Sequence, residues 1–167
     1  SNFIEGTEFT VDEAIDIVYR HREFPGRHAD SHDVTATYEL LRTPATVPAN
    51  ATEFVSWLKE SHASLMAARP DKRPGQFKLM ANQAGGYRFV SPELVLGTIE
   101  RGYPIIDSLQ HPFARAVFTM FLVSEVHPFD EGNGRLARLA ANVELTTGGQ
   151  QRYLIPIVAR NDYLNGL

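Results

Sequence analysis

The sequence contains no cysteine, one tryptophan and three methionines. The absence of cysteine excludes disulfide bonds and thiolate metal sites, and it favours a reducing compartment. No apolar run approaches the roughly 20 residues that a membrane-spanning helix needs. Positive charge is not in excess, because 16 Lys and Arg stand against 20 Asp and Glu, for a net charge of -4 at pH 7. We therefore expect a cytoplasmic protein that binds no membrane and, through this domain, no nucleic acid.

The length of 167 residues allows one domain with a proper core and is too short to predict two. Hydrophobic residues make up 43% and charged residues 22%, as in ordinary globular proteins. The chain begins with Ser1 instead of methionine, and its last residues, NDYLNGL, follow a helix-like pattern. We expect a single domain over residues 1–167 with further sequence beyond both ends. The sequence does not indicate an oligomeric state.

Hydrophobic periodicity and capping residues predict a mainly helical chain. Thr10 and Glu13 have the spacing of a capping box, and Asn50 is a suitable N-cap for a later helix. Ser91 followed by Pro92 is typical of another helix start. The expected helices span residues 11–24, 31–42, 51–69, 92–101, 112–126 and 135–145. The helix over 112–126 is apolar almost all round, which predicts that it is the buried centre of the bundle.

Residues 75–90 differ from the helical segments around them. Two β-prone stretches, QFKL and YRFV, flank the pair Gly85-Gly86, which suits a turn with positive φ. This segment is the only β candidate in the sequence. The predicted fold class is therefore all-α (mainly α), with one β-hairpin.

The stretch HPFDEGNGRLAR, from His127 to Arg138, has the residues for phosphate chemistry. A helix that begins after Gly-Asn-Gly offers unpaired backbone N–H groups and the positive end of its dipole to an anion. Arg135 and Arg138 are three residues apart and share a helix face. Glu131 could bind Mg²⁺ together with substrate phosphates, and a histidine such as His127 can accept a proton from a hydroxyl. The pattern predicts a site where a hydroxyl attacks a nucleotide phosphate; it lacks the alternating oxygen ligands of a calcium loop.

The same stretch resembles the signature of the Fic family, H-x-F-x-[DE]-G-N-G-R-x-x-R, at every specified position. A chance match anywhere in the chain is on the order of one in 10^8 at average residue usage. The resemblance implies a Fic-type helical bundle in which residues 75–90 form a flap that docks the target by strand-like pairing. It also implies transfer of AMP from ATP to a Ser, Thr or Tyr hydroxyl of a target protein, with release of pyrophosphate.

The resemblance assigns a role to each residue of the signature. His127 would be the catalytic general base, Glu131 would bind Mg²⁺ between the α- and β-phosphates, and Phe129 would fix the loop from below. The implied ATP-binding residues are Gly132, Asn133 and Gly134 as an anion hole, Arg135 at the phosphates and Arg138 at the γ-phosphate.

Residues 1–6, Ser-Asn-Phe-Ile-Glu-Gly, resemble the inhibitory motif of the family, [ST]-x-x-x-E-[GN]. By this resemblance Glu5 would pair with Arg138 and block productive binding of the γ-phosphate. Two alternatives stay open on the sequence: removal of AMP or transfer of another nucleotide in the same site, and a nucleotide-binding interaction module without turnover. The target protein and its modified residue cannot be identified from the sequence.

Overall fold

The computed structural model describes residues 8–43, 46–155, 159 and 161–162. In this part of the chain it has six α-helices and one two-stranded antiparallel hairpin, which confirms the predicted fold class. The elements are α1 (Val11–Arg20), α2 (His28–Arg42), α3 (Ala51–Leu65), β1 (Gln83–Ala84), β2 (Tyr87–Arg88), α4 (Val95–Ser108), α5 (Pro112–Val126) and α6 (Asn133–Thr147), with short 3-10 turns at Pro70–Lys72 and Pro92–Leu94.

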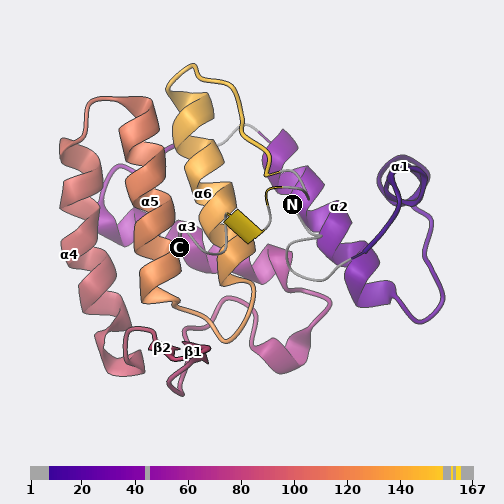
Figure 1. Cartoon of the computed structure of the whole chain (residues 1–167), viewed down its shortest axis with the longest axis horizontal. Helices are drawn as coiled ribbons and strands as arrows, with labels where there is room; N and C mark the ends of the chain where they lie inside the picture. Colours follow the sequence, from indigo (N-terminus) through magenta and orange to yellow (C-terminus); the bar gives the residue numbers. More distant parts are fainter. Residues whose placement is uncertain (1–7, 44–45, 156–158, 160, 163–167) are drawn as a thin grey trace.

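Helices α4, α5 and α6 stand side by side, with α3 packed behind them and α2 against α3 and α6 (Figure 1). Helix α1 packs on α2 at one end of the molecule. The hairpin and the loop from α5 to α6 lie at the same end of the bundle (Figure 1). None of the helices in the described ranges is long and apolar enough to cross a lipid bilayer.

Two of the three predicted helix starts, at Thr10 and Asn50, have the expected side-chain caps. Ser91 makes no side-chain cap hydrogen bond, and Pro92–Leu94 after it form a 3-10 turn, so α4 begins only at Val95. Thr10 accepts a hydrogen bond from the backbone N–H of Glu13, and the Glu13 carboxylate accepts one from the N–H of Thr10 at 2.7 Å. Asn50 accepts from the N–H of Glu53 at 2.9 Å and thereby caps α3. Each cap satisfies amides that the first helical turn leaves unpaired, with partners three residues away. Helix α2 begins at His28, three residues before the predicted start, and α3 ends at Leu65 instead of continuing to Pro70.

The predicted end of the fourth helix before Gly102 is wrong, because α4 continues to Ser108 through both Gly102 and Pro104. A Cβ atom on Gly102 would lie 2.6 Å from Leu122 Cδ1 of α5. This glycine therefore marks a close approach of two helices and does not terminate one. Tyr103 and Ile106 continue the buried face beyond it, so burial stabilises the helix past two residues of poor helix propensity.

The predicted centre of the bundle is also wrong. Helix α5 buries one face but leaves Phe113, Val117 and Phe121 between 45% and 62% exposed. The surrounded helix is α6, in which every residue from Arg135 to Leu145 is buried. Helix α6 carries two arginines, an asparagine and a glutamate among these buried positions, so its average hydrophobicity did not reveal its central place.

The hairpin forms at the predicted turn, but its strands are only two residues long. The segment 76–82 is not a strand of this hairpin. Its Lys78 donates its backbone N–H to the carbonyl of Pro128 at 2.9 Å, and the Lys78 side chain is buried. These residues therefore form a support under the α5–α6 loop, and only residues 83–88 project as a hairpin.

The close approach at Gly102 predicts a loss of stability on enlargement. We expect Gly102→Ala to lower the free energy of unfolding by about 1–3 kcal/mol, because the buried Leu122 side chain has to shift to admit a methyl group. Gly97→Ala is the matched control in the same helix, since nothing lies within 4 Å of its Cβ position. That variant should be neutral or up to ~1 kcal/mol more stable. Urea unfolding measures both, and an equal effect of the two substitutions would contradict the packing argument.

Candidate active site

The first half of the HPFDEGNGRLAR stretch forms the loop between α5 and α6, residues 127–132, here called the signature loop. His127 is the C-cap of α5 and has a left-handed backbone, with φ 48° and ψ 59°. Its N–H closes the helix on the carbonyl of Val123 at 3.0 Å. The chain therefore turns sharply at the histidine, and this turn directs the imidazole to the edge of the bundle.

Two contacts fix the orientation of the His127 ring. Its Nδ1 lies 3.2 Å from the carbonyl oxygen of Ser124, and since a carbonyl only accepts, Nδ1 must carry the proton. In the neutral ring the lone pair then resides on Nε2. The ring face stacks on Phe89, which follows β2, with centroids 3.8 Å apart and planes 14° from parallel.

The interior of the signature loop is held by a buried amide. The Asn133 side chain accepts from the N–H of Phe129 at 2.9 Å and donates to the Phe129 carbonyl at 2.8 Å. Asn82 donates a further hydrogen bond to the same carbonyl at 3.0 Å. Phe129 itself is fully buried, as expected for a residue that fixes the loop by packing.

His62 of α3 is a second anchor of the loop, and the sequence analysis missed it. Its ring stacks on Phe129 with centroids 3.7 Å apart. Nδ1 accepts the N–H of Gly75 at 2.9 Å, so Nε2 carries the proton that is donated to the Glu131 carbonyl at 3.0 Å. Burial lowers the pKa of His62 to about 4, which keeps the ring neutral near pH 7. The histidine thereby joins the signature loop to Gly75, the first residue of the segment 75–90.

Lys78 binds the C-terminal end of α5. Its ammonium donates to the carbonyl of Val126 at 3.1 Å and to Oδ1 of Asn82 at 2.7 Å, and the residue is 2% exposed. A cation is favourable at this position because the carbonyls at a helix C-terminus carry partial negative charge. Burial lowers the pKa of Lys78 to about 8. Lys78 and Asn82 thus connect the base of the hairpin to both sides of His127.

The N-terminus of α6 has the geometry of an anion site. No side chain among the described residues caps its first amides, which begin at Asn133. Gly132 precedes them with φ 78°, and a Cβ there would lie 2.8 Å from the sulfur of Met66. Only glycine meets both conditions, the left-handed backbone and the close neighbour. The first backbone N–H groups of α6 therefore lie next to the signature loop.

Arg135 is buried at this end of α6 and pairs with a carboxylate that the sequence analysis did not single out. Its guanidinium lies 2.8 Å from Asp33 of α2, and Asp33 also binds Arg69 at 2.9 Å. The Glu131 carboxylate is 3.9 Å from Arg135 and 3.6 Å from Lys72, and its side chain is 43% exposed. The Glu131 side chain is thus partly exposed to solvent and lies beside three cations, Lys72, Arg69 and Arg135.

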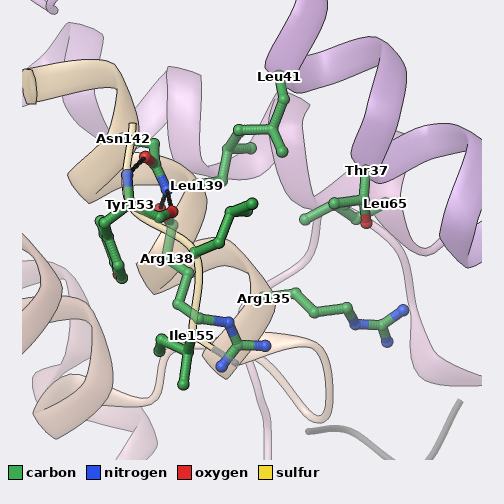
Figure 2. Close-up of a pocket in the computed structure, with 10 residues that line it drawn as sticks. Thr37, Leu41, Leu65, Arg135, Arg138, Leu139, Asn142, Tyr153 and Ile155 are labelled. Carbon is green, nitrogen blue, oxygen red and sulfur yellow. Dashed lines mark hydrogen bonds between the residues drawn. The ribbon is translucent and has the colours of Figure 1, made fainter. Parts of the chain in front are cut away.

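Arg135 and Arg138 line the same pocket between α2, α6 and the segment that follows α6 (Figure 2). Arg138 is 5% exposed. Asn142 closes the other end of the pocket, where it accepts the N–H of Tyr153 at 2.9 Å and donates to the Tyr153 carbonyl at 3.3 Å (Figure 2). Glu5, the expected partner of Arg138, lies outside the described residues.

The structure brings together the predicted residues from His127 to Arg138 on one loop and the first turns of one helix. Within the described ranges, no group of three or more His, Asp or Glu side chains could hold a metal ion alone. The residues that sequence reasoning missed are His62, Lys78, Asn82 and Asp33. For one of them, His62, the sequence offered a signal, because it is a polar residue on the inward face of a predicted helix. The other three residues carried no such signal.

Comparisons with known proteins show the family of the chain. The sequence pattern of the Fic/DOC family matches residues 52–145, more than half of the chain. The chain belongs to the Fic/DOC family. It is similar to "Protein adenylyltransferase fic-1" of Caenorhabditis elegans, with 23% identity over 175 residues, and to "Protein adenylyltransferase Fic" of Drosophila yakuba, with 25% over 170 residues. Each alignment covers 98% of this chain but 34% of the relative, so the chain spans about a third of these proteins.

Solved structures have the same fold. A Fic domain-containing signaling protein from Bacteroides thetaiotaomicron superposes with a TM-score of 0.81 at 19% identity, over 98% of this chain and 66% of that one. Fic-1 of C. elegans, residues 134–508, superposes with a TM-score of 0.78 at 22% identity, over 98% of this chain and 51% of that one. At these identities the likeness shows the fold.

The buried neutral His62 predicts a pH dependence of stability. Its pKa is about 4 in the folded state and near 6.5 when unfolded, so the unfolded chain binds more protons between these values. Its contribution to stability is fully present above pH 6.5 and is lost as the pH falls toward 4. Between pH 7 and pH 4.5 the wild type should lose about 2–3 kcal/mol more than His62→Gln, which cannot titrate. Urea unfolding at both pH values tests this, and parallel losses in the two proteins would contradict it.

Proposed function

We propose that this domain is a protein adenylyltransferase, which transfers AMP from ATP to a Ser, Thr or Tyr hydroxyl of a target protein. The observation that carries the proposal is the placement of an oriented histidine and an uncapped helix N-terminus on one fixed loop. The match of this loop to the full Fic signature supports it, and so do the relatives named protein adenylyltransferase. A cytoplasmic location stays a prediction from composition.

The proposed reaction starts at His127. Its Nε2 takes the proton of the target hydroxyl, and the hydroxyl oxygen forms a bond to the α-phosphorus of ATP. The bond from that phosphorus to the oxygen that bridges it to the β-phosphate breaks, and pyrophosphate leaves with the electron pair. A base in this role contributes roughly 10²- to 10⁴-fold to the rate. The hydrogen bond from Nδ1 to Ser124 orients the ring for this transfer.

Backbone amides and arginines would bind the phosphates. The amides of Gly132, Asn133 and Gly134 and the dipole of α6 favour negative charge at the start of the helix. Arg135 is compatible with an anionic ligand, because its buried Nε has no hydrogen-bond partner among the described residues. Arg138, one turn further, would pair with the γ-phosphate.

Glu131 fits the role of a Mg²⁺ ligand. Mg²⁺ commonly binds through one or two carboxylates, with substrate phosphates and water as the other ligands, so a single acid suffices here. The Glu131 side chain is half-exposed while its backbone carbonyl is held by His62. When bound, the ion would neutralise charge that develops on the phosphate oxygens.

The hairpin would dock the target protein. All four strand residues of β1 and β2 are exposed, so an extended peptide could pair with an edge. Self-inhibition by Glu5 is also part of the proposal. A carboxylate paired with Arg138 would compete with the γ-phosphate for the same guanidinium.

Labelling with α-³²P ATP tests the reaction and its inhibition together. We expect weak labelling of protein by the wild type, strong labelling by Glu5→Gly and none by the double variant Glu5→Gly/His127→Ala. The last loss should be at least about 100-fold, because the general base is removed.

Glu8→Gly is the matched control for Glu5→Gly, since Glu8 is an exposed acid three residues away. Its labelling should stay at the wild-type level. Strong labelling by the double variant would exclude His127 as the base. ATP binding without labelling in any variant would favour the non-catalytic alternative.

A second measurement addresses the metal. We expect Glu131→Gln to lower labelling at least about tenfold at limiting Mg²⁺, with partial recovery as Mg²⁺ is raised. The loop should stay in place because His62 binds the backbone of Glu131 and not its side chain. Asp130→Asn is the control, since Asp130 is the neighbouring acid and pairs with Arg73 at 3.5 Å. Equal losses in both variants would contradict a specific role for Glu131.

A further inference from the structure

Phe89 packs directly against His127, the proposed general base. It is the first residue after β2, and its ring covers one face of the His127 imidazole with centroids 3.8 Å apart. The planes are 14° from parallel, so the contact extends over the whole ring. The flap therefore touches His127 directly, through an apolar face that offers no hydrogen bond to the ring nitrogens.

Several contacts keep Phe89 in this position. Its N–H donates to the carbonyl of Asn82 at 3.2 Å, which closes the base of the hairpin. Tyr87 packs edge-on against the Phe89 ring, with centroids 5.4 Å apart, and its hydroxyl donates to the carboxylate of Glu125 in α5. Asn82 is in turn bound to the ammonium of Lys78 and to the carbonyl of Phe129. Phe89 is thus fixed to α5 and to the signature loop from both sides.

The stack has two physical consequences for His127. The hydrogen bond from Nδ1 restrains one edge of the ring, and the aromatic face restrains its rotation about the Cβ–Cγ bond, so both together define where Nε2 points. The benzyl group also removes water from one face of the imidazole.

We propose that Phe89 is a positioning residue that determines acceptor specificity: it orients His127 and favours a protein hydroxyl over water as the nucleophile. This proposal rests on the adenylyl-transfer function proposed above. In the competing reaction the oxygen of water bonds to the α-phosphorus, the bond to the β-phosphate oxygen breaks, and one water proton passes to Nε2. The products are AMP and pyrophosphate, and His127 then releases the proton to solvent. Phe89 restrains this hydrolysis because it limits both the aim of Nε2 and the access of water.

The test compares the two fates of the adenylyl group. Full-length protein in the wild-type and Glu5→Gly backgrounds is incubated with Mg²⁺ and α-³²P ATP, and released AMP and label bound to the chain's own hydroxyls are counted. We expect the ratio of released AMP to protein-bound label to rise at least about tenfold, or ~1.4 kcal/mol, in Phe89→Leu. Phe89→Tyr keeps the aromatic face, so its ratio of released AMP to protein-bound label should equal that of the parent protein. Phe113→Leu is the matched control, since Phe113 is an exposed phenylalanine at the far end of α5.

An NMR measurement separates this proposal from the proposed function. Protons of the His127 ring lie over the Phe89 face and should be shifted upfield by its ring current; the resonances are assigned by their loss in His127→Ala. They should move downfield in Phe89→Leu and stay in place in Phe89→Tyr and Phe113→Leu. An unchanged product ratio in Phe89→Leu would overturn the specificity role, and unchanged His127 resonances would overturn the positioning role. If the parent protein neither labels nor hydrolyses ATP, the adenylyl-transfer function fails, and the resonances alone decide whether Phe89 positions the ring.

Discussion

The site depends on the paired hydrogen bonds between the Asn133 side chain and the backbone of Phe129. A buried amide is costly unless both its donor and its acceptor are satisfied, and here both are satisfied by one residue of the signature loop. The pairing forces the loop into a tight turn and directs the Phe129 ring inward onto His62. It also leaves the backbone of Asn133 as the start of α6. One side chain thus holds both the loop that carries His127 and the helix end that would face the phosphates in the proposed function.

The second level of support comes from outside the signature. His62, Lys78 and Asn82 each bind backbone carbonyls of the signature loop or of the residue before it. Because they bind the main chain, they restrain its path without contacting the side chains of His127 and Glu131. In the proposed function this arrangement separates two tasks: residues of the signature would act on ligands, and His62, Lys78 and Asn82 hold the loop in shape.

Sequence reasoning succeeded where the determining contacts are local. The caps at Thr10 and Asn50 depend on partners three residues away, so their spacing could be read directly. It failed where the partner is distant in the chain. Gly102 is indistinguishable from a helix terminator until Leu122 is placed against it, and His62 meets its carbonyl partner 69 residues later. Likewise, QFKL was predicted as a strand because its partner, the carbonyl of Pro128, lies 50 residues away from Lys78.

The contact of Gly102 with Leu122 has a consequence at a distance. Leu122 precedes His127 by five residues in the same helix, which corresponds to about 7.5 Å along the axis. An α-helix resists compression, so an axial slip of α5 against α4 would carry the imidazole with it almost one to one. Side-chain packing between α4 and α5, at Gly102 and Leu122, thereby helps to set the position of His127. A small molecule or substitution that separates α4 from α5 would displace His127 without entering the pocket that Arg135 and Arg138 line.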